Sequence, residues 1–172
     1  MAARPGPVIW LTGLSGAGKT TIGRALGQVL TERGDTVELL DGDVLRQLLP
    51  GTGFSAAERD RHVRRTGVMA SRLAHHGITV VAALISPTAV ARDFVRSICP
   101  RFVEVYVSTP LEECERRDPK QLYARARHGD IQEFTGISAP YEPPADAEVV
   151  IDTRTCSVAD AVSQVLEAVR RA

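Results

Sequence analysis

The chain has 172 residues, of which 44% are hydrophobic, a length and composition typical of one globular domain and unlike a disordered protein. Lysine and arginine together number 21, as do aspartate and glutamate, so the formal net charge is zero. This balance excludes a global field that would attract nucleic acid or an anionic membrane, so any anion must be bound by local clusters. No apolar run approaches the roughly 18 residues of a membrane span, and the first residues carry no secretory signal. We therefore expect a cytoplasmic protein without nucleic-acid or membrane partners.

Apolar runs alternate with segments of helical period, which is the pattern of a parallel sheet with crossover helices. Strands are predicted at 8–12, 36–40, 78–84, 102–107 and 149–151, and helices at 19–33, 56–75, 88–98, 111–116 and 158–170. Gly34 and Gly77 follow two of these helices, at positions where a left-handed C-cap favours glycine. Ser55 and Glu58 have the spacing of a capping box before the helix at 56–75.

The loop after the first strand has the sequence GLSGAGKT at 13–20, which fits the phosphate-binding P-loop pattern G-x-x-x-x-G-K-[ST]. Glycines allow successive backbone N–H groups to point at a phosphate. Lys19 would reach the β- and γ-phosphates, and the Thr20 hydroxyl would be a ligand of Mg²⁺. The residues predicted to bind ATP are Gly13, Leu14, Ser15, Gly16, Ala17, Gly18, Lys19, Thr20 and Thr21.

Strand, loop and helix occur in the order that phosphate binding requires. The sequence therefore predicts an α/β fold, a P-loop NTPase-type three-layer sandwich with a five-stranded, mainly parallel sheet and helices on both faces. We expect a single kinase domain over residues 1–172.

An acidic pair, Asp41 and Asp43, follows the second predicted strand. Ligands of open α/β sheets bind outside the carboxyl ends of the strands, so both carboxylates should face the same crevice as the P-loop. One could hold a metal, directly or through water, while the other orients or accepts the proton of an attacking hydroxyl. The alternative is that Asp-Gly-Asp turns the chain and caps a short helix. The third strand leads into Ser86 and Pro87 without the usual Walker-B aspartate, which favours Asp41 and Asp43 as the acidic partners.

Basic and aromatic residues cluster after the acidic pair. Arginines are dense over 59–65, and Arg46 lies upstream. Guanidinium groups bind oxyanions in a bidentate manner, so this density indicates an anionic acceptor, although a solvated helix face is the alternative. Phe54 and Phe134 lie in polar segments, where each could stack on a base or anchor the core.

The segment 117–144, called the lid segment below, departs from the alternation of strands and helices. It is long and polar, is rich in proline and glycine, and carries Lys120, Arg125, Arg127 and His128. A loop of this length in a compact domain is usually functional, so we predict a mobile lid; a surface excursion is the alternative.

The chain resembles the adenylyl-sulfate kinase (APS kinase) family in segments that span nearly its whole length in the family's order. They are GLSGAGKT at 13–20, LDGD at 40–43 with Arg46, GFS at 53–55, Arg59, RR at 64–65, ISP at 85–87, EVYV at 104–107, DPK at 118–120 with LY at 122–123, FTGI at 134–137 and PYEP at 140–143. The segments after the P-loop are much more specific than the P-loop itself.

The resemblance implies transfer of the γ-phosphoryl group of MgATP to the 3′-hydroxyl of adenosine 5′-phosphosulfate (APS). The products are ADP and 3′-phosphoadenylyl sulfate (PAPS), in a step of sulfate assimilation. It implies catalytic roles for Asp43, Asp41 and Lys19, with Thr20 and Asp41 serving the metal. It implies that the acceptor is bound by Asp41, Asp43, Arg46, Phe54, Arg59, His62, Ile85, Ser86, Lys120 and Phe134, with the two phenylalanines sandwiching adenine and the two arginines holding phosphosulfate. The family also implies a homodimer.

Ser86 corresponds to a serine that is labelled in the family as a phosphoserine intermediate. Direct in-line transfer needs no covalent step, and the sequence offers no activating base next to Ser86. We expect Ser86 to line the acceptor pocket without forming a covalent intermediate.

Three positions depart from the family pattern. Val44 and His62 stand where the family often has asparagine, and Gln121 replaces a common glycine, which we expect to stiffen the lid segment. The asparagine at position 62 is expected to touch the acceptor, so Val44 and His62 leave open a related P-loop small-molecule kinase with another nucleotide-like acceptor. A separate alternative is a nucleotide-binding regulatory module.

Overall fold

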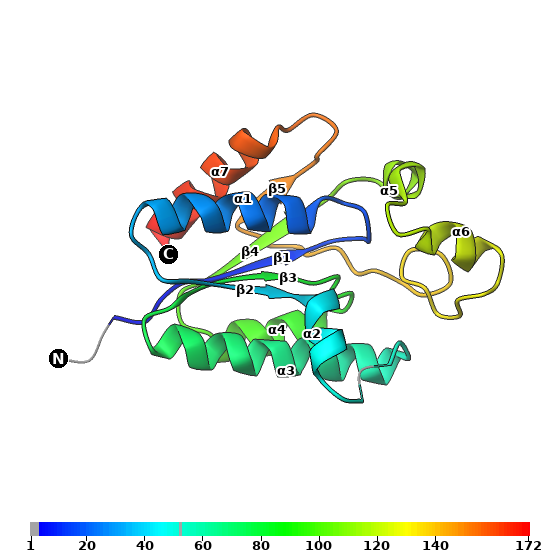
Figure 1. The fold of residues 1–172 in the computed structure, drawn as a ribbon, viewed down its shortest axis with the longest axis horizontal. Helices are drawn as coiled ribbons and strands as arrows, with labels where there is room; N and C mark the ends of the chain where they lie inside the picture. Colours follow the sequence, from blue (N-terminus) through cyan, green and yellow to red (C-terminus); the bar gives the residue numbers. More distant parts are fainter. Residues whose placement is uncertain (1–3, 52) are drawn as a thin grey trace.

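The computed structural model describes residues 4–51 and 53–172 and shows one sheet with helices on both faces (Figure 1). The strands are β1 (Val8–Thr12), β2 (Val37–Asp41), β3 (Thr79–Ala83), β4 (Phe102–Val107) and β5 (Val149–Ile151). They pair in the order β2-β3-β1-β4-β5, and all four pairings are parallel. The predicted α/β fold with a five-stranded sheet is confirmed.

Two pairs of long helices cover the sheet. Helices α1 (Lys19–Glu32) and α7 (Val158–Arg171) lie on one face, and α3 (Ala56–His75) and α4 (Ala89–Ile98) lie on the other (Figure 1). On β1, Ile9 and Leu11 belong to the core beneath α1 and α7, whereas Val8 and Trp10 belong to the core against α3 and α4. Because both faces are covered, β1 is fully buried and its sequence is a continuous apolar run rather than an alternating one.

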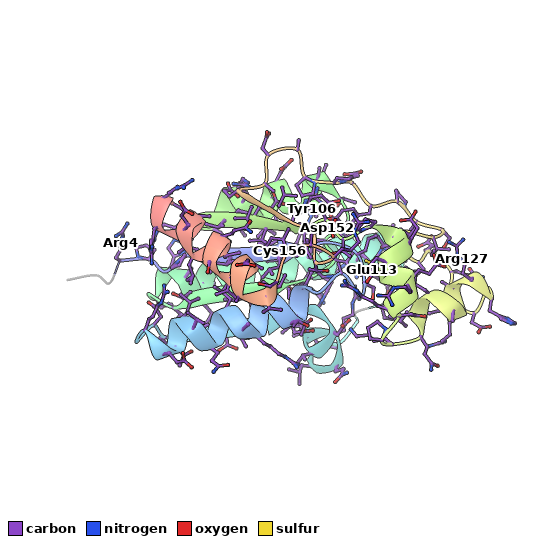
Figure 2. The ribbon with its side chains drawn as sticks, turned by 90° about the horizontal axis from the view of Figure 1, so that it is seen from above. Arg4, Tyr106, Glu113, Arg127, Asp152 and Cys156 are labelled. Atoms are coloured by element: carbon purple, nitrogen blue, oxygen red, sulfur yellow. The ribbon has the colours of Figure 1, made fainter. Side chains whose placement is uncertain are left out.

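Three short helices, α2 (Gly42–Leu48), α5 (Leu111–Arg117) and α6 (Leu122–Arg127), lie at the carboxyl end of the sheet (Figure 1). Helix α2 is the short helix of the capping alternative for Asp-Gly-Asp, whereas α6 was not predicted. The lid segment is therefore not a continuous irregular loop, because it contains α6. Arg127, which Figure 2 shows on α6 at the outer end of the molecule, forms an ion pair with Glu115 of α5 (2.7 Å).

The element ends agree with the predicted ones to within one residue, and the predicted helix caps are present. Gly34 and Gly77 have φ angles of 93° and 82°, and the Ser55–Glu58 capping box is formed in both directions. Strand β1 lies between β3 and β4, so the chain connections diverge to the two sides of β1. This switch point opens a crevice at the carboxyl end of β1, next to the P-loop.

Candidate active site

The P-loop joins β1 to α1, and its three glycines have backbone conformations that other residues rarely adopt. Gly13, Gly16 and Gly18 have φ angles of 149°, 76° and 109°. A Cβ atom on Gly13 would lie 2.4 Å from the carbonyl oxygen of Val107, so glycine is also required there for space. The Thr109 hydroxyl, from the loop after β4, donates a hydrogen bond to the Ala17 carbonyl oxygen (3.0 Å). The backbone conformation of the P-loop therefore depends on its own glycines and on contacts with β4 and the residues that follow it.

Lys19 is buried in the first turn of α1. Its ammonium group donates hydrogen bonds to the carbonyl oxygens of Gly13 (2.9 Å) and Leu14 (2.7 Å). Burial lowers the pKa of Lys19 to about 8, because the charged form is separated from bulk water. These hydrogen bonds go to neutral carbonyl groups, so the positive charge of Lys19 can neutralise an incoming phosphate.

The two carboxylate oxygens of Asp41 make different contacts. Its Oδ2 atom accepts a hydrogen bond from the Thr20 hydroxyl (2.9 Å), which brings the two predicted metal ligands together. Its Oδ1 atom accepts from the backbone N–H groups of Asp43 (2.9 Å) and Val44 (3.4 Å), which caps α2. The functional interpretation and the capping alternative therefore describe two oxygens of one carboxylate.

Asp43 lies in the first turn of α2, with its carboxylate more than half exposed. It forms an ion pair with the ammonium group of Lys120, which comes from the lid segment. The two residues are 77 positions apart in the sequence, so this contact joins the lid segment to the first turn of α2.

Two arginines lie beyond Asp43. The guanidinium group of Arg46 stacks over the Phe54 ring at 4.7 Å from its centroid and donates to the Gly53 carbonyl oxygen. Arg59, on the first turns of α3, donates to the carbonyl oxygen of Glu133 in the lid segment. Arg46 and Arg59 thus belong to different helices and place two cations at one end of the crevice.

The two predicted aromatic residues have different environments. Phe54 is 64% exposed, whereas Phe134 is buried and meets the Tyr123 ring edge-on, with 5.0 Å between the ring centroids. For Phe134 the core-anchor alternative therefore holds in this structure, although its side chain also borders the crevice.

One cavity of about 400 Å³ joins the P-loop to the acidic, basic and aromatic residues. The predicted site residues that line it are Ser15, Gly16, Gly18, Lys19, Thr20, Thr21, Asp43, Arg46, Phe54, Arg59, His62, Ile85, Ser86, Lys120 and Phe134. The predicted residues Gly13, Leu14, Ala17 and Asp41 do not line it. A second, more open hollow of about 560 Å³ lies beside residues 136–143 and is lined by no charged side chain, so it is not suited to a phosphate.

Comparisons with known proteins point to one family. Residues 5–152 match the family described as Adenylylsulphate kinase. The adenylyl-sulfate kinase of Synechococcus sp. (strain JA-2-3B'a(2-13)) is 47% identical over 169 residues, which cover 98% of this chain and 97% of the relative. The chain belongs to the adenylylsulphate kinase family.

Solved structures agree with this assignment. The Mycobacterium tuberculosis APS kinase CysC, in complex with AMPPNP and APS, is 38% identical with a TM-score of 0.92, over 97% of this chain and 99% of that one. The hexameric APS kinase from Thiobacillus denitrificans is 35% identical with a TM-score of 0.72, over 99% of this chain but 30% of that one. The predicted family and the prediction of an ATP-dependent kinase are confirmed, and neither alternative receives support from these relatives.

Ser86 is the serine that the family labels as a phosphoserine. In this chain it is buried, and both its hydroxyl and its carbonyl oxygen are hydrogen-bonded. Its hydroxyl accepts a hydrogen bond from the indole N–H of Trp10 (3.0 Å). Its carbonyl oxygen accepts from Arg92 (2.7 Å), which is itself ion-paired with Glu104 (3.0 Å). These contacts hold Ser86 at a φ of 41°, a conformation that is costly for a non-glycine residue. The side chain is suited to shaping the cavity wall.

The Ser86→Ala variant is expected to keep turnover within about threefold of wild type, because no bond to the hydroxyl is needed for in-line transfer. Its free energy of unfolding should fall by about 1–3 kcal/mol, since the Trp10 indole N–H loses its buried acceptor. Steady-state kinetics and denaturant unfolding measure the two effects separately. Loss of all turnover in a folded Ser86→Ala protein would support the covalent route instead.

The three positions that depart from the family pattern have different local environments in the structure. Gln121 has a φ of 55°, which explains why glycine is common at this family position. Val44 is exposed. His62 is buried on α3 and its Nε2 atom lies 3.0 Å from the Gly42 carbonyl oxygen.

Two charged residues that the sequence reasoning did not select also line the cavity. Arg117 comes from the end of α5 and donates to the Thr153 hydroxyl (2.7 Å), beside Gly18 of the P-loop. Glu133 accepts from the Arg59 side chain through its carbonyl oxygen and from the Ala56 N–H through its carboxylate (3.1 Å). The position of Arg117 directly before the DPK segment was the available signal, whereas nothing in the sequence singled out Glu133.

Proposed function

We propose that this chain transfers the γ-phosphoryl group of ATP to the 3′-hydroxyl of APS, producing ADP and PAPS. The observation that carries the proposal is the single cavity in which the P-loop meets Asp43, Arg46, Arg59 and the two phenylalanines. A phosphate-binding loop alone would fit any nucleoside triphosphatase. The added carboxylate, cations and aromatic rings fit an acceptor with a hydroxyl, an anionic group and a base.

The donor end of the cavity binds the triphosphate in this proposal. Backbone N–H groups of the P-loop surround the β-phosphate, and Lys19 neutralises charge on the β- and γ-phosphates. The neutral hydrogen bonds that Lys19 makes to Gly13 and Leu14 are exchanged for charged ones to phosphate oxygens.

Mg²⁺ accompanies ATP in the proposal, and two oxygen atoms, one at the start of α1 and one at the end of β2, suit it. Thr20 Oγ1 and Asp41 Oδ2 lie 2.9 Å apart and are the hard oxygen ligands that Mg²⁺ prefers, alone or through water. When bound there, the ion would supply positive charge to the phosphate oxygens.

The acceptor end is assigned from charge and shape. Arg46 and Arg59 lie on separate helices and would hold the phosphosulfate, for which two guanidinium forks are suited. Phe54 offers an exposed ring and Phe134 a ring at the cavity wall, and the adenine would lie between them. Ile85 and Ser86 would form the wall beside the acceptor.

The chemical step needs little beyond positioning and charge. The 3′-oxygen forms a bond to the γ-phosphorus as the bond to the β–γ bridging oxygen breaks, and ADP leaves. Asp43 orients the hydroxyl and accepts its proton. Because Lys120 pairs with Asp43, the lid segment would exchange this contact for substrate contacts once both ligands are bound.

The experiment that tests the proposal is a coupled assay of ADP formation with Mg²⁺, ATP and a panel of acceptors, with the product identified by mass spectrometry. We expect ADP formation to depend on APS and to yield PAPS in equal amounts, and AMP to be a much poorer acceptor because it lacks the sulfate. ATP consumption that APS does not stimulate would contradict the proposal.

Three further parts of the proposal concern assembly, location and organisation. A homodimer is proposed from the family resemblance, and sedimentation of the purified protein measures it. Among the described residues, no helix is both long and apolar enough to traverse a lipid bilayer. The cytoplasmic location, the single domain over 1–172 and the mobility of the lid segment remain predictions.

A further inference from the structure

Arg92 is a charged residue of α4 that is buried to all but 3% of its surface and has no part in the proposed chemistry. Its guanidinium group contacts three separate segments of the chain. It donates hydrogen bonds to the carbonyl oxygens of Ser86 (2.7 Å) and Glu142 (2.6 Å), and it forms an ion pair with the Glu104 carboxylate on β4 (3.0 Å). Arginine is rarely buried to this degree unless it is paired, and here the ion pair anchors to the sheet a group that binds two backbone carbonyls.

The first of these carbonyls belongs to the loop 84–87, all four residues of which line the cavity. The side of the loop toward β1 is held by Thr12, whose hydroxyl donates to the Ile85 carbonyl oxygen (2.7 Å). The side toward α4 is held by the bond from Arg92 to Ser86. Ser86 has a φ of 41°, and a non-glycine residue keeps such a conformation only where surrounding contacts impose it. The shape of this cavity wall therefore depends on Arg92.

The second carbonyl belongs to the end of the lid segment. Besides accepting from Arg92, Glu142 donates its backbone N–H to the Pro87 carbonyl oxygen (2.8 Å). Its carboxylate accepts from the Ala89 N–H (2.6 Å) in the first turn of α4. Arg92 thus joins the cavity wall to the segment that carries Phe134, which borders the same cavity.

We propose that Arg92 is a positioning residue for the phosphoryl acceptor, an inference that rests on the proposed function because Ile85 and Ser86 are there assigned to the acceptor. Arg92 does not line the cavity, so it acts through the wall that it holds and not by touching a substrate. Neither of the two carbonyls belongs to the P-loop, so ATP binding should not depend on Arg92.

The test compares the KM values for APS and ATP in wild type and in Arg92→Met. The KM for APS should rise about 10- to 100-fold, the range for loss of a hydrogen bond from a charged donor. The KM for ATP, and kcat at saturating APS, should stay within about threefold of wild type, because the interactions lost do not involve the reacting groups. General loosening of the protein would instead raise both KM values.

Arg96→Met is the matched control. It removes another arginine of α4 that pairs with Glu104 (3.1 Å), but at a partly exposed position outside the cavity wall. Its KM for APS should stay within about twofold of wild type, since ion pairs at partly exposed positions contribute little.

A second variant keeps the proposal testable if Arg92→Met does not fold. Arg92→Lys keeps a positive charge beside Glu104, but one ammonium group does not reproduce the planar fork that reaches both carbonyls. Its KM for APS should rise about 3- to 10-fold, between wild type and Arg92→Met. A KM for APS within twofold of wild type in Arg92→Lys, where Arg92→Met does not fold, overturns the inference.

Trp10 reports on the wall directly, because it is the single tryptophan of the chain and its indole N–H donates to the Ser86 hydroxyl (3.0 Å). It is fully buried, so acrylamide should quench its fluorescence poorly in wild type. Quenching should increase in Arg92→Met, where the wall is released, and should remain at the wild-type level in Arg96→Met. Unchanged quenching in Arg92→Met would show that Arg92 does not hold the wall.

Binding provides a measurement that does not depend on catalysis. Calorimetric titration with APS, in the presence of a non-hydrolysable ATP analogue, should show the same loss of affinity in Arg92→Met as the kinetics. Equal affinities and equal KM values for APS in wild type and Arg92→Met overturn the inference. A wild type that binds APS but does not phosphorylate it contradicts the proposed function alone, because the affinities still decide the role of Arg92. A wild type that does not bind APS contradicts both.

Discussion

The Asp43→Asn variant is expected to lose about 10²- to 10⁴-fold in kcat, the range for removal of a general base, while ATP affinity stays near wild type. The amide has nearly the shape of the carboxylate but cannot accept the proton of the 3′-hydroxyl. Asp43 is outside the P-loop and mostly exposed, so its replacement should affect neither nucleotide binding nor folding. Steady-state kinetics with APS and calorimetric titration with an ATP analogue measure the two quantities.

Two variants test whether the loss of kcat in Asp43→Asn comes from the missing carboxylate itself. Asp60→Asn makes the same chemical change at a half-buried ion pair with Arg64 (2.8 Å) outside the cavity, and should leave kcat unchanged. Lys120→Met removes the partner of Asp43 in the lid segment, and so reports how much of the loss comes from that contact. A kcat for Asp43→Asn within threefold of wild type would show that Asp43 is not the base.

The Lys19→Met variant is expected to lose about 10²- to 10³-fold in kcat, the range for removal of one electrostatic contact to the transition state. Methionine fills nearly the same volume without the charge that neutralises the phosphates. The free energy of unfolding of the ligand-free protein should not fall, because a desolvated charge is removed with the side chain. ATP should no longer raise the melting temperature, which thermal unfolding with and without nucleotide measures.

The pH dependence of kcat/KM for ATP tests the charge of Lys19 without changing the side chain. The folded pKa of about 8 is lower than the ordinary value of 10.5, so the free enzyme loses this charge as the pH rises through 8. In wild type, kcat/KM for ATP should therefore fall about tenfold per pH unit well above pH 8. The Arg24→Met variant, which removes a cation from an exposed position of the same helix, should keep this alkaline limb and full activity. A wild-type profile that is flat to pH 10 would contradict the assigned role.

Helix α6 was the part of the fold that the sequence did not reveal. Helix α6 is stabilised at its start by Asp118, whose carboxylate accepts from the N–H groups of Tyr123 (3.1 Å) and Ala124 (3.0 Å). The buried Tyr123 hydroxyl donates to the Ser15 carbonyl oxygen (2.8 Å), so α6 docks on the P-loop. A helix of six residues is not stable by propensity alone, and its tertiary contacts leave no periodic pattern to detect.

The sequence alone determined the P-loop, the order of strands and helices, and the end of β2 at which the acidic pair lies. These features depend on local causes: glycine φ angles, apolar runs buried on both faces, and helix caps. The tertiary structure alone decided which distant groups meet, as when Lys120 pairs with Asp43 and Glu133 accepts from Arg59. It also decided that His62 is buried with one nitrogen unpaired. Such contacts join residues more than 70 positions apart or depend on how a side chain is enclosed, and neither is encoded in local spacing.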